Sequence, residues 1–309
     1  MSLSANTPHI VFCVNREVLA GLHVALYSSL LHYPEAQPPP CFHIYHQGLS
    51  SKDIDSIDRT LSLAGKKYQV RYPTISVKRF EKAKTLWGSH MPYARLLIPD
   101  QFDCERFLYL DADILVTTDL FSIYNQDLGD QTIGVVAPHL IQDMHESAFY
   151  AGLSIEMDKP YFNSGVMLVD VLAWKKSRVT ERCLDLCEKY PEQMISADQS
   201  VLNAVMYGGF HELNSKYNYY CPAEEAVNSI EDGILHFIGS PKPWDPLAKY
   251  FHKNFSYYRE YSEKIVHNPV KPRISLNGLK RSLRLPVIYL RKILKGKTLI
   301  SRQRTTHQD

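Results

Sequence analysis

The stretch RFLYLDADILV, Arg106–Val116, is the most strongly apolar run of the chain, and two acids interrupt it. Its composition and length predict a buried strand. Asp111 and Asp113 stand two residues apart, so on an extended chain they share one face, about 6–7 Å apart along it. A bend at the end of this strand can bring both carboxylates toward one hard cation.

Short apolar runs on either side of this stretch alternate with helical patterns. We expect strands at His9–Asn15, Cys41–His46, Tyr68–Tyr72 and Ile234–Ile238, and helices at Glu17–Tyr33, Ser50–Ala64, Val171–Tyr190 and Asp198–Tyr207. The segment His139–Pro160 is expected to mix loop and helix. This alternation predicts an α/β domain with a mostly parallel sheet flanked by helices. Such sheets bind ligands at the carboxyl ends of their strands, where the two acids lie.

The composition excludes several classes of protein. The chain has 309 residues, of which 45% are hydrophobic and 22% charged, so it is neither disordered nor fibrous. No apolar run approaches the roughly 18 to 20 residues of a membrane span, and residues 1–7 lack a secretory signal pattern. The six cysteines show no C-x-x-C spacing, and we expect a reducing, cytoplasmic location.

The net charge of +2 hides an uneven distribution. Residues 271–309 contain eleven Lys or Arg and one acid, a charge of +10, so the rest of the chain carries −8. We therefore divide the chain into a catalytic domain, residues 1–267, and a small basic appendage, residues 268–309. Asn268–Leu276, with two prolines, is the expected linker between them.

Within the appendage, Ser282–Gly296 has the pattern of a basic amphipathic helix. One face carries Leu283, Val287, Leu290 and Leu294, and another carries Arg284, Arg291 and Lys295. Such a segment suits the surface of an anionic membrane, and a plain solvated tail is the alternative. Binding to nucleic acid is disfavoured because Tyr289 is the one aromatic residue available for stacking on bases.

An Asp-x-Asp string alone is weak evidence for a metal site, since about one is expected by chance in a chain of this length. A second one, Asp53-Ile54-Asp55, is present. It falls in the first turns of a polar helix, where acids are favoured by the helix dipole, and we interpret it as a solvated face. Asp111 and Asp113 differ because a buried strand carries them to the edge of the sheet where ligands bind.

Four motifs in order make the pattern specific. FLYLDADILVTTDL, YFNSGVMLVD, SADQSVLNAV and LHFIGSPKPW resemble the retaining glycosyltransferases of family 8, and in particular bacterial lipooligosaccharide galactosyl- and glucosyltransferases. The resemblance runs from about His9 to Trp244. It implies the GT-A nucleotide-sugar-binding fold.

The resemblance implies a metal site for Mn²⁺, with Mg²⁺ as an alternative ion. Its ligands are Asp111, Asp113 and His236, and Ala112 contacts the donor between the two acids. Taken alone, His236 would be interpreted as a hydrogen-bonded histidine in a core strand. Gly239 and Lys242 match positions that meet the UDP phosphates, where a small residue allows close approach and lysine supplies a positive charge.

The same resemblance assigns residues to the donor sugar. Asn163 meets the sugar, and the small Ser164 and Gly165 leave room for it, although a turn before a strand explains these three equally well. Asp198 hydrogen-bonds sugar hydroxyls, and Gln199 lies beside the anomeric carbon. Without the resemblance, Asp198 would be a helix N-terminal acid.

Two further positions are implied at the nucleotide. Arg95 matches an arginine that reaches the diphosphate and the donor sugar, although a lone helical arginine would be a solvated charge. Asn15 stands where the family commonly has an acid that contacts uracil, and an asparagine amide can hydrogen-bond a base edge as well. The segment Ala137–Glu146, near the acceptor site, departs from the family pattern.

The expected function is a retaining transferase that moves galactose or glucose from a UDP-sugar to a glycan or glycolipid acceptor. The lipopolysaccharide core of a bacterium is the expected acceptor class, and the enzyme is expected at the inner face of the cell membrane. Because Gln199 is a poor nucleophile, same-face attack is favoured over a covalent intermediate on Asp198. The alternatives are a phosphohydrolase of the haloacid dehalogenase kind and a non-catalytic nucleotide-sugar-binding protein.

Overall fold

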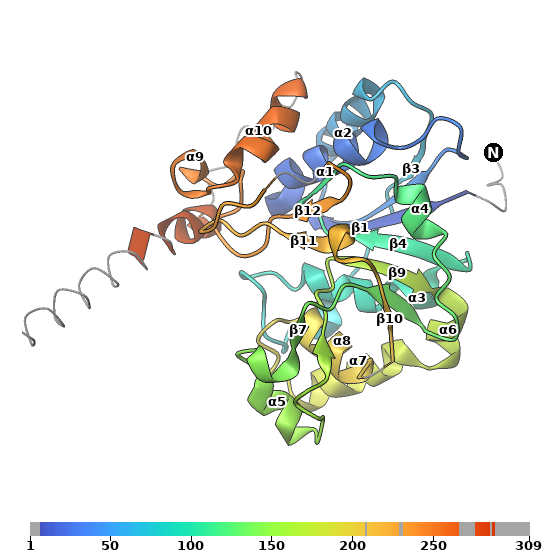
Figure 1. The fold of residues 1–309 in the computed structure, drawn as a ribbon, viewed down its shortest axis with the longest axis vertical. Helices are drawn as coiled ribbons and strands as arrows, with labels where there is room; N and C mark the ends of the chain where they lie inside the picture. Colours follow the sequence, from blue (N-terminus) through green and yellow to red (C-terminus); the bar gives the residue numbers. More distant parts are fainter. Residues whose placement is uncertain (1–6, 208, 229–230, 266–275, 285, 288–309) are drawn as a thin grey trace, which may run out of the picture.

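The computed structural model describes residues 7–207, 209–228, 231–265, 276–284 and 286–287 (Figure 1). A seven-stranded sheet with the order β10-β6-β9-β4-β1-β2-β3 runs through the molecule. Its strands are β1 (His9–Asn15), β2 (Cys41–Gln47), β3 (Gln69–Arg71), β4 (Arg106–Leu110), β6 (Ile133–Val135), β9 (Val166–Asp170) and β10 (His211–Glu212). β9 is antiparallel to both of its neighbours, and the other pairs are parallel. The mostly parallel mixed sheet is therefore confirmed.

Helices cover both faces of this sheet (Figure 1). Alternate residues of β1 enter different cores, because side chains of a strand point to opposite faces in turn. Ile10, Phe12 and Val14 pack with α1 (Leu19–Leu31) and α2 (Ser51–Leu63). Val11 belongs to the other core, with α3 (Ile98–Gln101), α6 (Val171–Lys176), α7 (Val179–Lys189) and α8 (Asp198–Val205). The expected helix over Val171–Tyr190 is thus two helices, separated at Arg178, whose φ is 50°.

The predicted single strand over Arg106–Val116 is wrong, because the chain forms two strands there. After β4 the chain leaves the large sheet, and β5 (Ile114–Val116) joins a small sheet with β12 (Ile234–His236) and β11 (Tyr219–Tyr220). β5 pairs antiparallel with β12, which places Ile114 opposite His236. Asp111, Ala112 and Asp113 form the connection between the two sheets, which explains how a continuous apolar run carries a polar site.

The remaining elements are short. β7 (His139–Leu140) pairs with β8 (Pro160–Tyr161), and α5 (Ser147–Gly152) lies between them in sequence, in agreement with the mixture of loop and helix expected there. Three further helices are α4 (Leu120–Tyr124), α9 (Ala248–Phe251) and α10 (Phe255–Lys264), and residues 276–284 form the C-terminal helix. α10 packs against α1, whose other neighbours include β5 and α2. α1 is therefore buried on nearly all sides.

The second Asp-x-Asp string lies in α2 and caps it. The Ser50 side chain accepts a hydrogen bond from Asp53 N, and the Asp53 carboxylate accepts one from Ser50 N at 2.8 Å. Arg16 forms an ion pair with the same carboxylate at 3.0 Å. The interpretation of a solvated face holds for the exposed Asp55 and is wrong for Asp53, which has a structural role.

Candidate active site

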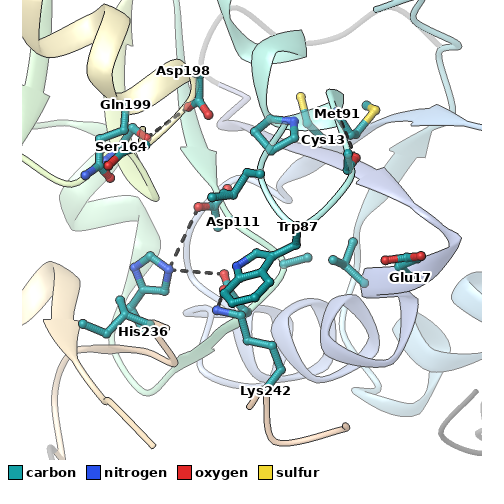
Figure 2. Close-up of a pocket in the computed structure, with 18 of the residues that line it drawn as sticks. Cys13, Glu17, Trp87, Met91, Asp111, Ser164, Asp198, Gln199, His236 and Lys242 are labelled. Carbon is teal, nitrogen blue, oxygen red and sulfur yellow. Dashed lines mark hydrogen bonds and ion pairs between the residues drawn. The ribbon is translucent and has the colours of Figure 1, made fainter. Parts of the chain in front are cut away.

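A cavity of about 340 Å³ opens at the carboxyl ends of β1 and β4 (Figure 2). Every site residue predicted from the sequence lines it, with the exception of Gly165. These lining residues are Asn15, Arg95, Asp111, Ala112, Asp113, Asn163, Ser164, Asp198, Gln199, His236, Gly239 and Lys242. The tertiary structure therefore collects into one cavity residues that span more than two thirds of the chain.

Asp111, Asp113 and His236 come together in the wall of the cavity, and Figure 2 shows the His236 ring turned toward Asp111. His236 Nε2 lies 3.2 Å from Asp113 Oδ1 and 4.0 Å from Asp111 Oδ2. The three potential ligand atoms lie within 4.8 Å of one another. Two carboxylate oxygens and one imidazole nitrogen form a donor set that fits Mn²⁺ and other divalent ions of the first transition row.

Lys242 binds the second oxygen of Asp113 and also donates to the carbonyl oxygen of Phe237. Burial alone would raise the pKa of Asp113, but Lys242 and His236 override that effect and hold its pKa well below the usual range. Asp113 is therefore an anion at any physiological pH. The ammonium group of Lys242 is paired with Asp113, and Lys242 lines the cavity, where its positive charge can attract a further negative group.

Gly165 packs behind this group and does not line the cavity. A Cβ atom at this position would lie 2.3 Å from His236 Cε1 and 2.9 Å from Asp111 Oδ2. Gly165 N donates to the side chain of Asn163, and its carbonyl oxygen accepts from Asp111 N at 2.8 Å. Glycine is thus required at position 165 by the close contact with His236 and Asp111. That Gly165 also leaves room for the donor sugar stays a prediction.

A second glycine, which the sequence reasoning missed, supports the same loop. A Cβ at Gly21 of α1 would lie 2.4 Å from the Trp244 ring and 2.5 Å from the carbonyl oxygen of Ala112. A side chain at position 21 would therefore force Trp244 or the backbone at Ala112 to move, because protein interiors are closely packed. Gly21 therefore allows α1 to approach the Asp-x-Asp connection closely. No local signal marks this role, because the contact joins segments about 90 and 220 residues apart.

Arg95 is buried, which excludes the alternative of a solvated helical charge. It lies in the 3₁₀ helix Met91–Leu96 and is 5% exposed. Its guanidinium binds Asp111 Oδ1 at 2.8 Å, Asp198 Oδ2 at 2.9 Å and Ser164 O at 2.6 Å. The structure thus shows Arg95 holding two carboxylates in position. The direct contact of Arg95 with a diphosphate stays a prediction.

Asp198 is 2% exposed and begins α8. Burial raises its pKa, Arg95 opposes the shift, and Asp111 adds to it. The preceding residue, Ala197, has a φ of 54°, a strained conformation for a residue with a Cβ atom. The strain at Ala197 lies directly beside Asp198 and Gln199, in the wall of the cavity.

The Gln199 amide has fixed partners on both ends. Its Oε1 accepts from Asn163 Nδ2 at 2.9 Å and from Ser164 N at 3.2 Å, and its Nε2 donates to the Tyr161 hydroxyl at 2.8 Å. The Tyr161 hydroxyl in turn donates to Glu146 at 2.6 Å. Gln199 is therefore oriented by its neighbours before any ligand binds.

Glu146 is a buried carboxylate that the sequence reasoning did not single out. It is 3% exposed and accepts hydrogen bonds from Tyr150, Tyr161, Ser200 and the backbone of Ser196. It ends the segment Ala137–Glu146 that departs from the family pattern. The only sign of this role in the sequence was an acidic residue, Glu146, within a segment that departs from the family pattern.

Asn15 and Glu17 also line the cavity, and Figure 2 shows Glu17 away from His236. Asn15 donates to Ser89 Oγ at 3.1 Å and accepts from Glu17 N at 3.0 Å. Arg281 lines the cavity, although we assigned it to the basic appendage. It forms a double contact with the buried Asp245, at 2.6 and 2.8 Å, and Asp245 accepts from Lys242 N. Arg281 therefore brings the helix of residues 276–284 to the cavity wall, and the membrane association of residues 268–309 stays a prediction.

A second group of side chains of the kinds that bind metals lies near the amino ends of β1 and β2. His9, Cys41 and His43 approach one another, and His9 Nδ1 and His43 Nε2 hydrogen-bond at 3.0 Å. The Phe102 ring packs against both histidines. Burial lowers the pKa of His9 to about 4 and that of His43 to about 3. The two neutral rings hydrogen-bond to each other, and we interpret this buried group as part of the core.

Comparison with known proteins identifies the family of this chain. A model described as glycosyl transferase family 8 matches residues 9–248. General stress protein A of Bacillus subtilis is 23% identical over 288 residues, which cover 84% of this chain and 96% of that protein. Lipopolysaccharide glucosyltransferase WaaO of Escherichia coli is 27% identical over 252 residues, 77% of this chain and 73% of that protein.

A solved structure of the galactosyltransferase LgtC, in complex with donor and acceptor sugar analogs, superposes with a TM-score of 0.69. It is 24% identical and covers 82% of this chain and 95% of that one. This likeness establishes the fold, which is the GT-A fold. Because the family model covers well over half of the sequence, the chain belongs to glycosyl transferase family 8.

Proposed function

We propose that this glycosyltransferase transfers galactose or glucose from a UDP-sugar to a saccharide acceptor with retention of configuration, and that it requires Mn²⁺ or Mg²⁺. The observation that carries the proposal is the convergence of Asp111, Asp113 and His236 beside the ammonium group of Lys242. Three acceptor atoms that face one another suit a cation, and the adjacent lysine suits a phosphate. The cavity volume of about 340 Å³ lies in the range of small-ligand sites.

A bound ion would neutralise charge on the departing UDP phosphate. Lys242 then offers its ammonium group to the same diphosphate, and the backbone at Gly239 lines the cavity next to it. Gly239 has a φ of 72°, so a side chain at this position would be strained. The side chain of Asn15, which Ser89 and Glu17 orient, would face the nucleotide of a bound donor.

Retention of configuration by same-face attack is favoured over a covalent intermediate. Both candidate residues are engaged by protein groups: Asp198 by Arg95 and Ser164, and Gln199 by Asn163 and Tyr161. A buried carboxylate held by a guanidinium is a weak nucleophile. In this proposal Asp198 and Gln199 shape the sugar site, and the leaving phosphate accepts the proton of the acceptor hydroxyl.

The acceptor class is a glycan or glycolipid, such as a bacterial lipopolysaccharide core, and the enzyme works at the inner, cytoplasmic face of the membrane. Similarity to lipopolysaccharide glucosyltransferases supports this acceptor. Among the described residues no helix is long and apolar enough to cross a membrane. Leu276, Leu279, Leu283 and Val287 are exposed on the C-terminal helix. Residues 288–309, with Leu290, Leu294 and the basic residues after them, lie outside the described part of the chain.

The experiment that tests the function is a melting-temperature screen followed by product analysis. We expect UDP and UDP-hexoses to stabilise the protein when Mn²⁺ is present and to have little effect when a chelator removes the ion. A panel of donor sugars with mass detection then identifies the hexose, and the anomeric proton signal of the product reports retention. Stabilisation without transfer or hydrolysis would favour a binding protein. Release of phosphate from phosphate monoesters would instead favour the phosphohydrolase, against the family assignment.

A further inference from the structure

Asn218 connects His236, one of the three potential metal ligands, to the residues around Gln199. It ends the 3₁₀ helix Ser215–Asn218, directly before β11, and is 2% exposed. Its Nδ2 lies 3.1 Å from Asn163 Oδ1 and 3.5 Å from Asn163 O, and its Oδ1 lies 2.8 Å from His236 Nδ1. A buried amide with partners on both ends has one orientation that satisfies all of them.

Backbone groups determine that orientation. Gly165 N, which can only donate, lies 2.9 Å from Asn163 Oδ1, so this atom is the amide oxygen. The backbone carbonyl of Asn163 can only accept, so the end of Asn218 that faces it and Asn163 Oδ1 is the NH₂ group. The direction of each hydrogen bond therefore follows from atoms whose roles are not ambiguous.

The consequence is a defined tautomer of His236. The amide oxygen of Asn218 can only accept, and hence His236 Nδ1 carries the proton in their 2.8 Å hydrogen bond. Nε2, on the opposite side of the ring, faces Asp111 and Asp113. Without a metal ion it can donate a proton to Asp113, and with an ion bound between the carboxylates its lone pair would be the ligand. This is the nitrogen that a metal bound between the two carboxylates would require.

We propose that Asn218 is a positioning residue that fixes the tautomer and the ring orientation of His236, so that Nε2 is available as a metal ligand. The inference rests on the metal site of the proposed function and adds a residue that contacts no substrate. Hydrogen-bond partners of metal-bound histidines change metal affinity by about 10- to 100-fold when they are removed. Asn218 is expected to have an effect of this size.

The same set of hydrogen bonds continues to Gln199. Ser164 N identifies Gln199 Oε1 as the amide oxygen, and Asn163 donates to that oxygen from its own NH₂ group. Asn163 thus contacts Asn218 through one end of its amide and Gln199 through the other. The orientation of the metal-binding histidine and that of the residue expected beside the anomeric carbon are set by one shared side chain.

The two ends of the Asn218 amide can be tested separately. Asn218→Leu removes both, and we expect Mn²⁺ to bind about 10- to 100-fold more weakly, as measured by electron paramagnetic resonance of free Mn²⁺ without any nucleotide. Asn218→Asp keeps an acceptor for His236 Nδ1 and loses the donor to Asn163. We expect this variant to retain Mn²⁺ affinity and to melt at a lower temperature, because its second oxygen faces two oxygens of Asn163.

Asn254→Leu is the matched control. Asn254 is 1% exposed and bonds the backbone of Pro222, Glu225 and Val227, away from the cavity. Its loss should lower the melting temperature without changing Mn²⁺ affinity. A direct readout on the wild-type protein is the ¹⁵N spectrum of the histidine rings with Mg²⁺ bound, where His236 should show a protonated Nδ1.

The outcomes separate this inference from the function on which it rests. Wild-type protein that binds neither Mn²⁺ nor UDP with Mn²⁺ would overturn the metal site and this inference together. Wild-type protein that binds Mn²⁺, with Asn218→Leu folded and equal to it in affinity, would overturn the role of Asn218 alone. If Asn218→Leu does not fold, loss of Mn²⁺ affinity in Asn218→Asp or a protonated Nε2 in the spectrum would overturn it.

Discussion

Replacement of Asp113 by asparagine should reduce transfer by about 100- to 1,000-fold at saturating donor. A metal ion that neutralises a leaving phosphate contributes several kcal/mol to the barrier, and each 1.36 kcal/mol is a factor of ten in rate. Asp113 is the carboxylate that contacts both His236 and Lys242, and asparagine keeps its shape without its charge. The measurements are kcat for the UDP-hexose and the affinity for Mn²⁺.

The second Asp-x-Asp string provides the control for this prediction. Asp55→Asn changes the same residue type in the same sequence pattern, on the exposed side of α2. It should leave kcat and Mn²⁺ affinity at the wild-type level. An Asp113→Asn enzyme that keeps more than about a tenth of the wild-type rate at all Mn²⁺ concentrations would contradict the proposed metal site.

Replacement of Arg95 by methionine should lower the free energy of unfolding by about 3–5 kcal/mol, the usual cost of removing one partner from a buried ion pair. Methionine fills much of the same volume but leaves Asp111 and Asp198 without the cation between them. Asp198 is 2% exposed, and among the described residues Arg95 is the one cation that forms an ion pair with it. Transfer should also fall, because both carboxylates line the cavity.

The measurement is urea denaturation at pH 7, with the slope of the transition checked for constancy. Arg178→Met is the control, since the ion pair between Arg178 and Glu181 on α7 is exposed. Its unfolding midpoint should match that of the wild type, because exposed pairs are screened by water. A midpoint for Arg95→Met equal to that of Arg178→Met would mean that Arg95 does not hold the two acids together.

Local sequence patterns predicted most of the helices and strands, but they did not predict which strands pair with one another. The strand expected at His9–Asn15 and the helix expected at Ser50–Ala64 depend on patterns among neighbouring residues, and the structure confirms both. The run Arg106–Val116 was wrongly predicted as one strand, because an apolar composition does not indicate which sheet each part of the run joins. Its second half pairs with β12, more than a hundred residues later, and only that pairing bends the chain at the two acids.

The candidate site shows the same division. Asp111 and Asp113 followed from a buried strand that ends in carboxylates, whereas His236 was identified through the family resemblance and resembles a core histidine by itself. Arg95 was assigned to the donor site through the resemblance alone, and only the structure shows it buried between Asp111, which follows β4, and Asp198, which begins α8. Asn218, Glu146 and Arg281 had no recognisable motif, since each acts through a neighbour distant in sequence.

The sequence by itself determined the α/β class, the family and the two acids at the end of the most apolar strand. These depend on periodicity and on short motifs, which are encoded within a few residues of one another. Only the tertiary structure decided which nitrogen of His236 faces the acids, what Arg95 holds, and that the C-terminal helix reaches the cavity. Hydrogen bonds and buried ion pairs require positions within about 3 Å, and strand pairing and helix packing set those positions between distant segments.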